Sequence, residues 1–398
     1  CVTEIIKIKL IPAGYGMSIL VSVGGVHPIN ILIDGGTSNS YSNGLKKEVD
    51  NIIALNEKIN LVVCTHIDHD HISGLTKLLM DGYGTHIEKI WYNGFLQIID
   101  EKYYNQVENK KTIDDTRLLN RFIQNSIILE DQHNIGIADA LTFGALAIEQ
   151  KIPINVETAG KAICVKNEHS IVKYKLGDVE LIILGPTSEC LRQQEIKWER
   201  EMIAKGFHFS VPDKIIHIKA FELMMERIIM NYSSESYSIS SRNHFEKYCD
   251  DLLDSDSSIT NQSSISFIIK YNEKSILFLG DSVIDKSLLE RIEKAVGKVF
   301  KFNAIQLPHH GSRYNITIDF IKRYIAEEYY ILTDSTKFNH PDICVLADIA
   351  LLNKERKTFV FNYPIVKANF ICNKEWQEEY YYQIYVGNGK KSVERIYI

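Results

Sequence analysis

Apolar and polar residues alternate along the first part of the chain. The alternation covers residues 4–10, 18–23 and 29–33, and Gly-rich segments separate these stretches. A period of two residues is typical of strands with one buried face, so we expect three successive antiparallel strands. The sequence then predicts a helix over residues 45–55 and a short apolar strand over residues 61–63.

Hairpin patterns recur further along the chain. Residues 172–184 form two apolar runs around Gly177-Asp178, and residues 265–271 and 275–279 flank Asn272-Glu273. Turn residues between such runs predict β-hairpins. The sequence also predicts helices over residues 286–296 and 317–325, and strands over residues 304–307 and 330–333.

Two charged, helix-rich stretches interrupt the strands. The first, at about 95–170, contains expected helices around 117–123 and over 137–150, and the second, at about 187–258, begins with one over 191–205. Its Ser-rich parts, 233–241 and 250–258, are typical of loops. The chain has 398 residues, 45% of them hydrophobic and 24% charged, which is enough for one large domain with insertions. We therefore predict a single α/β domain over residues 1–398 that carries both stretches as insertions.

One short segment holds most of the candidate metal ligands. Residues 66–71 read His-Ile-Asp-His-Asp-His, directly after the apolar strand, and Ser73-Gly74-Leu75 leads out of them. We expect a tight polar loop between a buried strand and a helix, where an α/β scaffold exposes functional side chains. Neighbouring carboxylates repel one another unless a cation neutralises them. The segment therefore predicts a metal site.

Three further motifs with potential ligands each follow a predicted strand. They are Gly280-Asp281-Ser282, the run from Pro308 to Ser312, and Asn339-His340-Pro341. Brought into one cleft, the candidates would suffice for two divalent cations about 3.5–4 Å apart. The expected metal ligands are His66, Asp68, Asp70, His71, Asp281, His309, His310 and His340. Successive residues leave a strand on opposite sides, which favours only one of His309 and His310 as a ligand. The oxygen-rich set favours manganese, or zinc in a mixed site.

Composition restricts the substrates and the cellular location that we expect for this site. The net charge of -6 argues against a uniformly basic, nucleic-acid-coating surface but allows a local basic groove. The seven cysteines are widely spaced and form no CxxC motif, so we expect no disulfide framework and a cytoplasmic location. The longest apolar stretch, around residues 137–148, contains Asp139 and is too short to span a bilayer.

Taken in order, the motifs resemble the metallo-β-lactamase fold. More narrowly, they resemble the soluble metallo-hydrolase domain of the DNA-uptake competence proteins and their free-standing relatives. The resemblance rests on DGG at Asp34, HxDxDH at residues 66–71, GD at Asp281, PHHGS at residues 308–312 and HP at His340. It implies an αββα sandwich of two mixed sheets with the metal cleft at one edge, and hydrolysis, with relatives acting as nucleases on DNA.

The chain departs from the wider superfamily at two positions. That superfamily carries HxHxDH, whereas Asp68 stands here in place of the second His, a feature shared by the competence-type branch. A further superfamily His before the GD motif is missing, and Asn261 lies near its position. These differences make the first metal position the weaker one.

The resemblance also implies roles for individual residues. Asp281 would bridge the metals, Asp70 would ligate one metal while orienting the nucleophile, and His310 or His340 would be a ligand or general acid. Asp70 and His310 are thus the expected catalytic residues, and His69 would point away from the metals. Supporting positions beside the ligands are Asp34, Asn261, Ser282 and Ser312.

Three functions are compatible with these features. The leading hypothesis is a metal-dependent phosphodiesterase, a nuclease that cleaves DNA or RNA. The second is a dimetal hydrolase of a small substrate such as a phosphocholine ester, a cyclic nucleotide or a lactone. The third is a partner-binding protein with a degenerate site, whose insertions form the interface; protein docking through the insertions is also compatible with catalysis.

Overall fold

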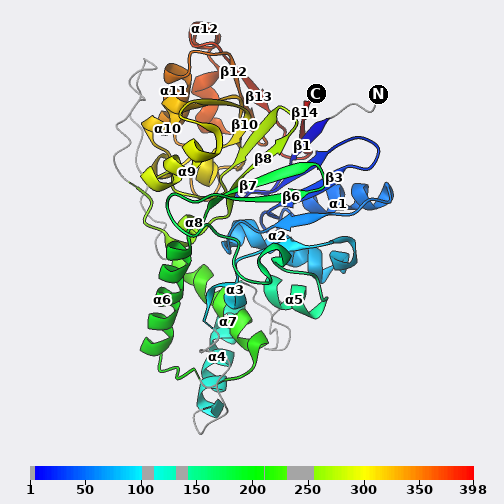
Figure 1. Ribbon diagram of the computed structural model, residues 1–398, viewed down its shortest axis with the longest axis vertical. Coiled ribbons are helices and arrows are strands. Elements are labelled where there is room, and N and C mark those ends of the chain that lie inside the picture. The colour runs from blue at the N-terminus through cyan, green and yellow to red at the C-terminus, as the bar shows by residue number, and fades with distance from the viewer. Residues whose placement is uncertain (1–4, 101–111, 131–141, 210, 231–254) are drawn as a thin grey trace.

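The computed structural model describes residues 5–100, 112–130, 142–209, 211–230 and 255–398, which fold around two β-sheets (Figure 1). The first sheet has six strands in the order β14-β1-β2-β3-β4-β5. Their bounds are β1 (Ile6–Leu10), β2 (Ile19–Val23), β3 (Ile29–Ile33), β4 (Leu61–Val63), β5 (Ile90–Trp91) and β14 (Val393–Tyr397). The first three strands pair antiparallel, with Val21 opposite both Ile8 and Ile31, as the alternation predicted.

The second sheet has eight strands in the order β13-β12-β11-β10-β9-β8-β7-β6. Their bounds are β6 (Val172–Leu176), β7 (Val179–Gly185), β8 (Ser266–Tyr271), β9 (Lys274–Phe278), β10 (Phe300–Gln306), β11 (Tyr324–Ile331), β12 (Lys357–Phe361) and β13 (Tyr382–Val386). Both predicted hairpins, β6–β7 and β8–β9, are confirmed. Strands β9 to β13 run parallel, so their carboxyl ends meet at one edge.

The two sheets pack face to face with helices outside them, which confirms the expected αββα sandwich. Side chains of both sheets, including Ile8 and Val63 of the first and Phe267 and Phe278 of the second, are fully buried in one shared core. Helices α1 (Leu45–Ala54) and α2 (His69–Met80) cover the first sheet. The second sheet is covered by α9 (Lys286–Val296), α10 (Ile318–Arg323) and α11 (Ile343–Leu352).

Five helices from the two interrupting stretches pack together into a helical lobe. They are α3 (Phe95–Ile98), α4 (Thr112–Glu130), α5 (Phe143–Glu149), α6 (Ser188–Ala204) and α7 (Lys214–Met230). Helix α7 contacts α3, α4 and α5, and α5 also contacts α2 of the sandwich. Much of the lobe extends away from the sheets in Figure 1. The lobe core contains Phe95, Trp198 and Phe221, and the rings of Phe95 and Trp198 lie 5.2 Å apart.

The remaining helical segments are short. They are α8 (Ile259–Gln262), α12 (Lys374–Glu379) and the 3-10 turns Tyr83–His86, Val156–Thr158, Pro308–Gly311, Arg313–Asn315 and Val366–Cys372. No helix in the described ranges is both long enough and apolar enough to cross a membrane.

Some predicted elements differ from the structure. The helix expected over 317–325 is wrong at its end, because α10 stops at Arg323 and Tyr324 begins β11, where it pairs with Phe300. Of the helix expected over 137–150, the described part is Phe143–Glu149. Helix α7 was not predicted. The Ser-rich residues 233–241 and 250–254 lie outside the described residues.

Candidate metal centre

The candidate ligands after β4 lie partly on a helix rather than all in a loop. Helix α2 begins at His69, and the backbone N–H groups of His71 and Ile72 donate to the Asp68 carbonyl at 2.9 and 3.0 Å. Asp70 and His71 therefore occupy the first helical turn, and the expectation of a loop through residue 71 is wrong at this end. The first turn of a helix holds its side chains in a fixed direction, which suits ligands.

A close approach of α2 to the loop after β3 places Asp34 behind the ligands. The Gly74 N–H donates to the Gly36 carbonyl at 2.9 Å, and a Cβ on Gly74 would lie 1.9 Å from the Gly35 carbonyl oxygen. Only glycine allows this packing. Fully buried Asp34 then accepts hydrogen bonds of 2.7 Å from the Thr65 N–H, the Thr65 hydroxyl and Nδ1 of His71.

These bonds fix which nitrogen each imidazole directs into the cleft. His71 donates from Nδ1 to a carboxylate, and His310 donates from Nδ1 to the Leu332 carbonyl at 2.7 Å. The Thr65 hydroxyl donates to Asp34 and so accepts from Nδ1 of His66 at 2.9 Å. When these three rings are neutral, Nε2 is left with its lone pair, the arrangement expected of metal-ligating histidines.

Asp281 and His310 come from the carboxyl ends of neighbouring strands of the second sheet. Asp281 follows β9 through Gly280, which has a φ of +55°, and the Gln306 side chain accepts from the N–H groups of Leu279 and Gly280 at 2.8 Å each. His310 follows β10 and brings Nε2 to 3.2 Å from Oδ2 of Asp70. The parallel order of β9 and β10 therefore brings distant motifs to one site.

Six buried side chains converge here. The Nε2 atom of His66 lies 3.6 Å from Asp68 and 3.7 Å from Asp281, and the Nε2 atom of His71 lies 3.4 Å from Asp281. Two groups within the described residues have ligand atoms close enough to share an ion: His66, His71 and Asp281, and Asp70, His71 and His310. His71 belongs to both groups, and Asp281 presents one oxygen to His66 and the other to His71.

The polar atoms of the cleft fit bound cations. Four of the buried atoms that lack a hydrogen-bond partner in the described structure belong to these six side chains, namely Nε2 of His66 and His71 and one oxygen each of Asp68 and Asp281. Unpartnered buried polar atoms are destabilising, and here all four belong to ligand-type groups facing each other. Three imidazoles with three carboxylates suit zinc or manganese.

Electrostatics keep most of the carboxylates charged. Burial raises the pKa of Asp281, but His71, His309 and His310 outweigh it and hold that pKa well below its usual range. In the same way, His71 and His310 outweigh burial and lower the pKa of Asp70. Burial dominates at Asp68 and raises its pKa. Anionic Asp70 and Asp281 are thus available to a cation.

His309 and His340 border the centre, outside both ligand groups. The prediction that His309 and His310 leave a strand in opposite directions is wrong, because β10 ends at Gln306 and both residues adopt left-handed conformations, with φ of 47° and 58°. Both rings consequently approach the site, and Nε2 of His309 lies 3.8 Å from Asp281. The His340 ring lies 5.1 Å from that of His309.

The other expected supporting residues contact the site indirectly. Asn261 donates to Asp256 at 2.6 Å, and its amide lies 3.3 Å from Nδ1 of His309. The Ser282 hydroxyl points to the Ser264 carbonyl at 3.5 Å, and Ser312 accepts from the Tyr314 N–H at 3.2 Å. His69 bonds to Ser73 through Nδ1 at 2.9 Å.

Sequence reasoning missed several supporting groups. Thr65 joins Asp34 to His66, and Asn315 accepts from His309 at 3.0 Å while donating to the Asp281 carbonyl at 2.9 Å. Thr65 directly precedes the motif and could have been suspected, whereas nothing in the sequence marks Asn315 or the Leu332 carbonyl.

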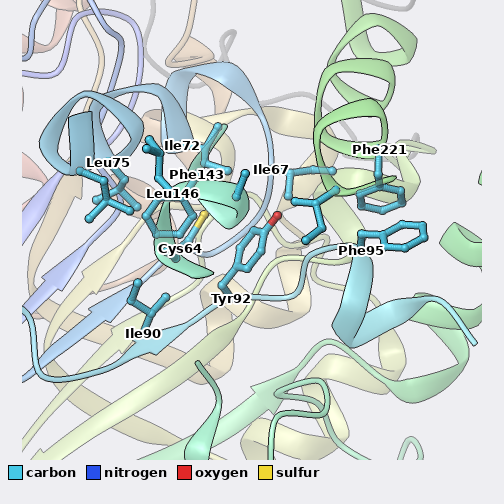
Figure 2. Close-up of a cluster of buried hydrophobic side chains, with 14 of the residues drawn as sticks. Cys64, Ile67, Ile72, Leu75, Ile90, Tyr92, Phe95, Phe143, Leu146 and Phe221 are labelled. Carbon is cyan, nitrogen blue, oxygen red and sulfur yellow. The ribbon is translucent and has the colours of Figure 1, made fainter. Parts of the chain in front are cut away.

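The helical lobe packs against the back of the ligand segment. Ile67, between two ligands, is buried in the same core as Tyr92, Phe143 and Phe221 (Figure 2). The Cys64 thiol donates to the His66 carbonyl at 3.2 Å. The lobe therefore helps to set the position of the ligand backbone.

Comparisons with known proteins agree with this architecture. Residues 26–80, which run from before β3 to the end of α2, match the model of the metallo-beta-lactamase superfamily. The match and the observed sandwich together support a metallo-β-lactamase fold with a metal-binding site. No curated protein sequence matches the chain.

Several solved structures are similar at low identity. The metallo-beta-lactamase fold protein YhfI from Bacillus subtilis is 10% identical with a TM-score of 0.40, covering 99% of this chain and 100% of that one. Zn(2+)-bound PqqB from Methylobacterium extorquens is 9% identical with a TM-score of 0.38, covering 98% and 99%. CmlA, a diiron beta-hydroxylase from Streptomyces venezuelae, is 10% identical with a TM-score of 0.38, and the match covers 100% of this chain but 54% of CmlA. Likenesses this distant carry no argument about activity, and the resemblance to competence proteins stays a prediction.

Proposed function

We propose that this protein is a dimetal phosphodiesterase that cleaves DNA or RNA. The observation that carries the proposal is the convergence of Nε2 of His66, His71 and His310 on the carboxylates of Asp70 and Asp281. Two bound divalent cations, zinc or manganese, would lower the pKa of a water molecule and offset the charge that develops on a phosphodiester during attack.

The chain's own residues would divide the remaining work. Asp281 would help to hold the cations, with Oδ2 toward His66 and Oδ1 toward His71. Asp70, with a lowered pKa, would orient the attacking water through a charged carboxylate. His310 donates from Nδ1 to the Leu332 carbonyl and brings Nε2 to 3.2 Å from Asp70, which favours a ligand role. His340, whose ring lies 5.1 Å from that of His309, would then be the remaining candidate proton donor to the leaving group, although burial lowers its pKa and so disfavours its protonated form.

Setting and partners are part of the same proposal. We expect the protein to act in the cytoplasm, with nucleic acid as substrate and the helical lobe as a docking surface for a protein partner. The oxygen donor of Asp68 supports placement in the competence-type branch. These expectations do not depend on the chemistry of the site. Any of them could be refuted while the proposed phosphodiester cleavage still holds.

The test compares matched histidine variants. Wild type, Asp70→Ala/His71→Ala and His169→Ala would be incubated in manganese or zinc with labelled single- and double-stranded DNA and RNA, and with bis-p-nitrophenyl phosphate. His169 is an exposed histidine that pairs with Glu290 at 3.0 Å, and neither residue is a candidate metal ligand. We expect cleavage by wild type and His169→Ala, and none by the double variant.

Other results would redirect the assignment. Turnover of bis-p-nitrophenyl phosphate without cleavage of any nucleic acid would favour a small phosphodiester substrate. Absence of metal by elemental analysis after loading would refute both enzymatic functions and leave the partner-binding alternative.

A further inference from the structure

Three side chains from two loops form a cation–aromatic cluster beside the metal centre. The rings of Tyr15 and Phe338 meet edge to face, with centroids 5.7 Å apart and an interplanar angle of 80°. The Lys337 ammonium lies 4.7 Å from the Tyr15 ring centroid and 4.8 Å from that of Phe338. The Phe338 ring is also 6.3 Å from the ring of His309. We call these three residues the rim cluster.

The loop that carries Tyr15 is bonded directly to a metal ligand. The Met17 N–H donates to the Asp70 carbonyl at 3.1 Å, and a Cβ on Gly16 would lie 1.9 Å from that same oxygen. The loop therefore needs glycine at residue 16 in order to approach the ligand. Tyr15 is thus two residues from a backbone hydrogen bond to Asp70.

The loop that carries Lys337 and Phe338 is bonded to the other side of the site. It follows Leu332, whose carbonyl accepts from His310, and the Thr333 hydroxyl donates to the Tyr15 carbonyl at 3.3 Å. The Asp334 N–H also donates to the Gly14 carbonyl at 2.9 Å. The loops of the rim cluster are thus bonded to each other, and each adjoins the backbone of a ligand or of a residue that orients one.

The cluster holds a positive charge beside the metal centre. Lys337 is exposed, and an exposed lysine is ordinarily free to adopt many rotamers. Two aromatic rings within 5 Å restrict its ammonium by cation–π attraction. Asp334, the nearest acidic residue in the loop, is already bonded to the N–H and hydroxyl of Thr336 at 2.9 and 2.7 Å.

This charge favours one class of substrate. A cationic headgroup, such as choline, would meet an ammonium that already occupies the aromatic rings, and would be repelled. A second phosphate of the substrate would instead be attracted, and the partly buried rings offer a surface on which a base can stack. We propose that the rim cluster binds the phosphate next to the scissile one, which makes an oligonucleotide strand the substrate; this inference rests on the proposed phosphodiesterase function.

The test separates substrate binding from chemistry. Wild type, Lys337→Gln, Phe338→Leu and the control Lys286→Gln, an exposed lysine on α9, would be compared. Kinetics on a single-stranded DNA oligonucleotide and on bis-p-nitrophenyl phosphate would be measured in manganese, and anisotropy would report oligonucleotide binding by the metal-free protein. Only the oligonucleotide carries a flanking phosphate.

We expect Lys337→Gln to raise KM for the oligonucleotide about tenfold and to reduce the slope of log KM against log salt by about 0.7, the value for one phosphate contact on a single strand. Turnover of bis-p-nitrophenyl phosphate should change less than twofold, and metal-free binding should weaken in parallel with KM. Equal losses on both substrates, or unchanged oligonucleotide binding in both rim variants, would refute the proposal that the rim cluster binds a flanking phosphate. If wild type turns over neither substrate, the proposed function fails, and the anisotropy comparison still decides the subsite.

Discussion

Glu222 is a carboxyl group buried where α7 of the helical lobe meets the first sheet, directly behind the ligand segment. It accepts hydrogen bonds from the Tyr92 hydroxyl at 2.7 Å and from the Gly144 N–H at 3.0 Å. Burial raises the pKa of Glu222 from 4.5 to about 7, although these hydrogen bonds oppose the rise. Glu222→Gln removes the titration and keeps an oxygen acceptor, so it isolates the effect of this charge.

The direction of the effect follows from proton linkage. Between its unfolded and folded pKa values, Glu222 binds more protons in the folded state, so the free energy of unfolding falls as pH rises through this window. The shift corresponds to about 3 kcal/mol in full, of which about 2.5 kcal/mol would appear between pH 5 and pH 8. In Glu222→Gln this pH-dependent loss should disappear.

Urea unfolding of the metal-free protein measures this difference. Wild type, Glu222→Gln and Glu149→Gln would be compared at pH 5 and pH 8 in the presence of chelator. Glu149 is an exposed carboxyl on nearby α5 and should leave the pH dependence unchanged. If wild type and Glu222→Gln lose the same stability between the two pH values, Glu222 is charged in the folded state at both, and the argument from burial is refuted.

Three further changes test the centre itself. Asp34→Asn should weaken metal binding by about 10–100-fold in calorimetric titration, because the residue orients a ligating histidine; unchanged affinity would contradict this role. Gly74→Ala should destabilise the fold by about 1–3 kcal/mol in urea, since its Cβ would overlap the Gly35 carbonyl, whereas Lys77→Ala on the same helix should have little effect. Adding manganese or zinc to chelated protein should raise Tm, because buried carboxylates lose their mutual repulsion, and a Tm that does not respond would argue against a metal site.

The strands that frame the site were predictable because each has one face in a continuous core. In β1, buried Ile6, Ile8 and Leu10 alternate with more exposed lysines, so the burial pattern repeats the sequence pattern. The turn at Gly177 was predictable for a local reason, since its φ of +59° suits glycine. Local sequence patterns therefore predict the strands of the sheets and the strand ends at which the ligands lie.

The orientation of the ligands depends on partners distant in sequence and was not predictable locally. Asp34 and His71 are 37 residues apart, and His310 reaches the Leu332 carbonyl 22 residues away. Helix α7 escaped prediction because its apolar residues face several neighbours in the lobe at once, which removes the usual helical period.

The two metal positions differ in ways that only sequence and structure together explain. One position draws on Asp70, His71 and His310, and both of its imidazoles are oriented by full acceptors, a carboxylate and a carbonyl. The other position draws on His66, His71 and Asp281; of these, His66 is oriented only through a hydroxyl, and Asp68 lies 3.6 Å from its Nε2.

Asp68 and Asn261 are the two departures from the wider superfamily, and both lie on the side of the His66 position. The structure places the Asn261 amide against His309, whose other nitrogen faces Asp281 at 3.8 Å. Asn261 therefore lies beside an imidazole that faces Asp281 and does not itself supply one. The histidine particular to this position, His66, is oriented by a hydroxyl rather than by a carboxylate or a carbonyl, and Asp68 adds an oxygen beside it, so this position should bind its cation more weakly and prefer a harder one.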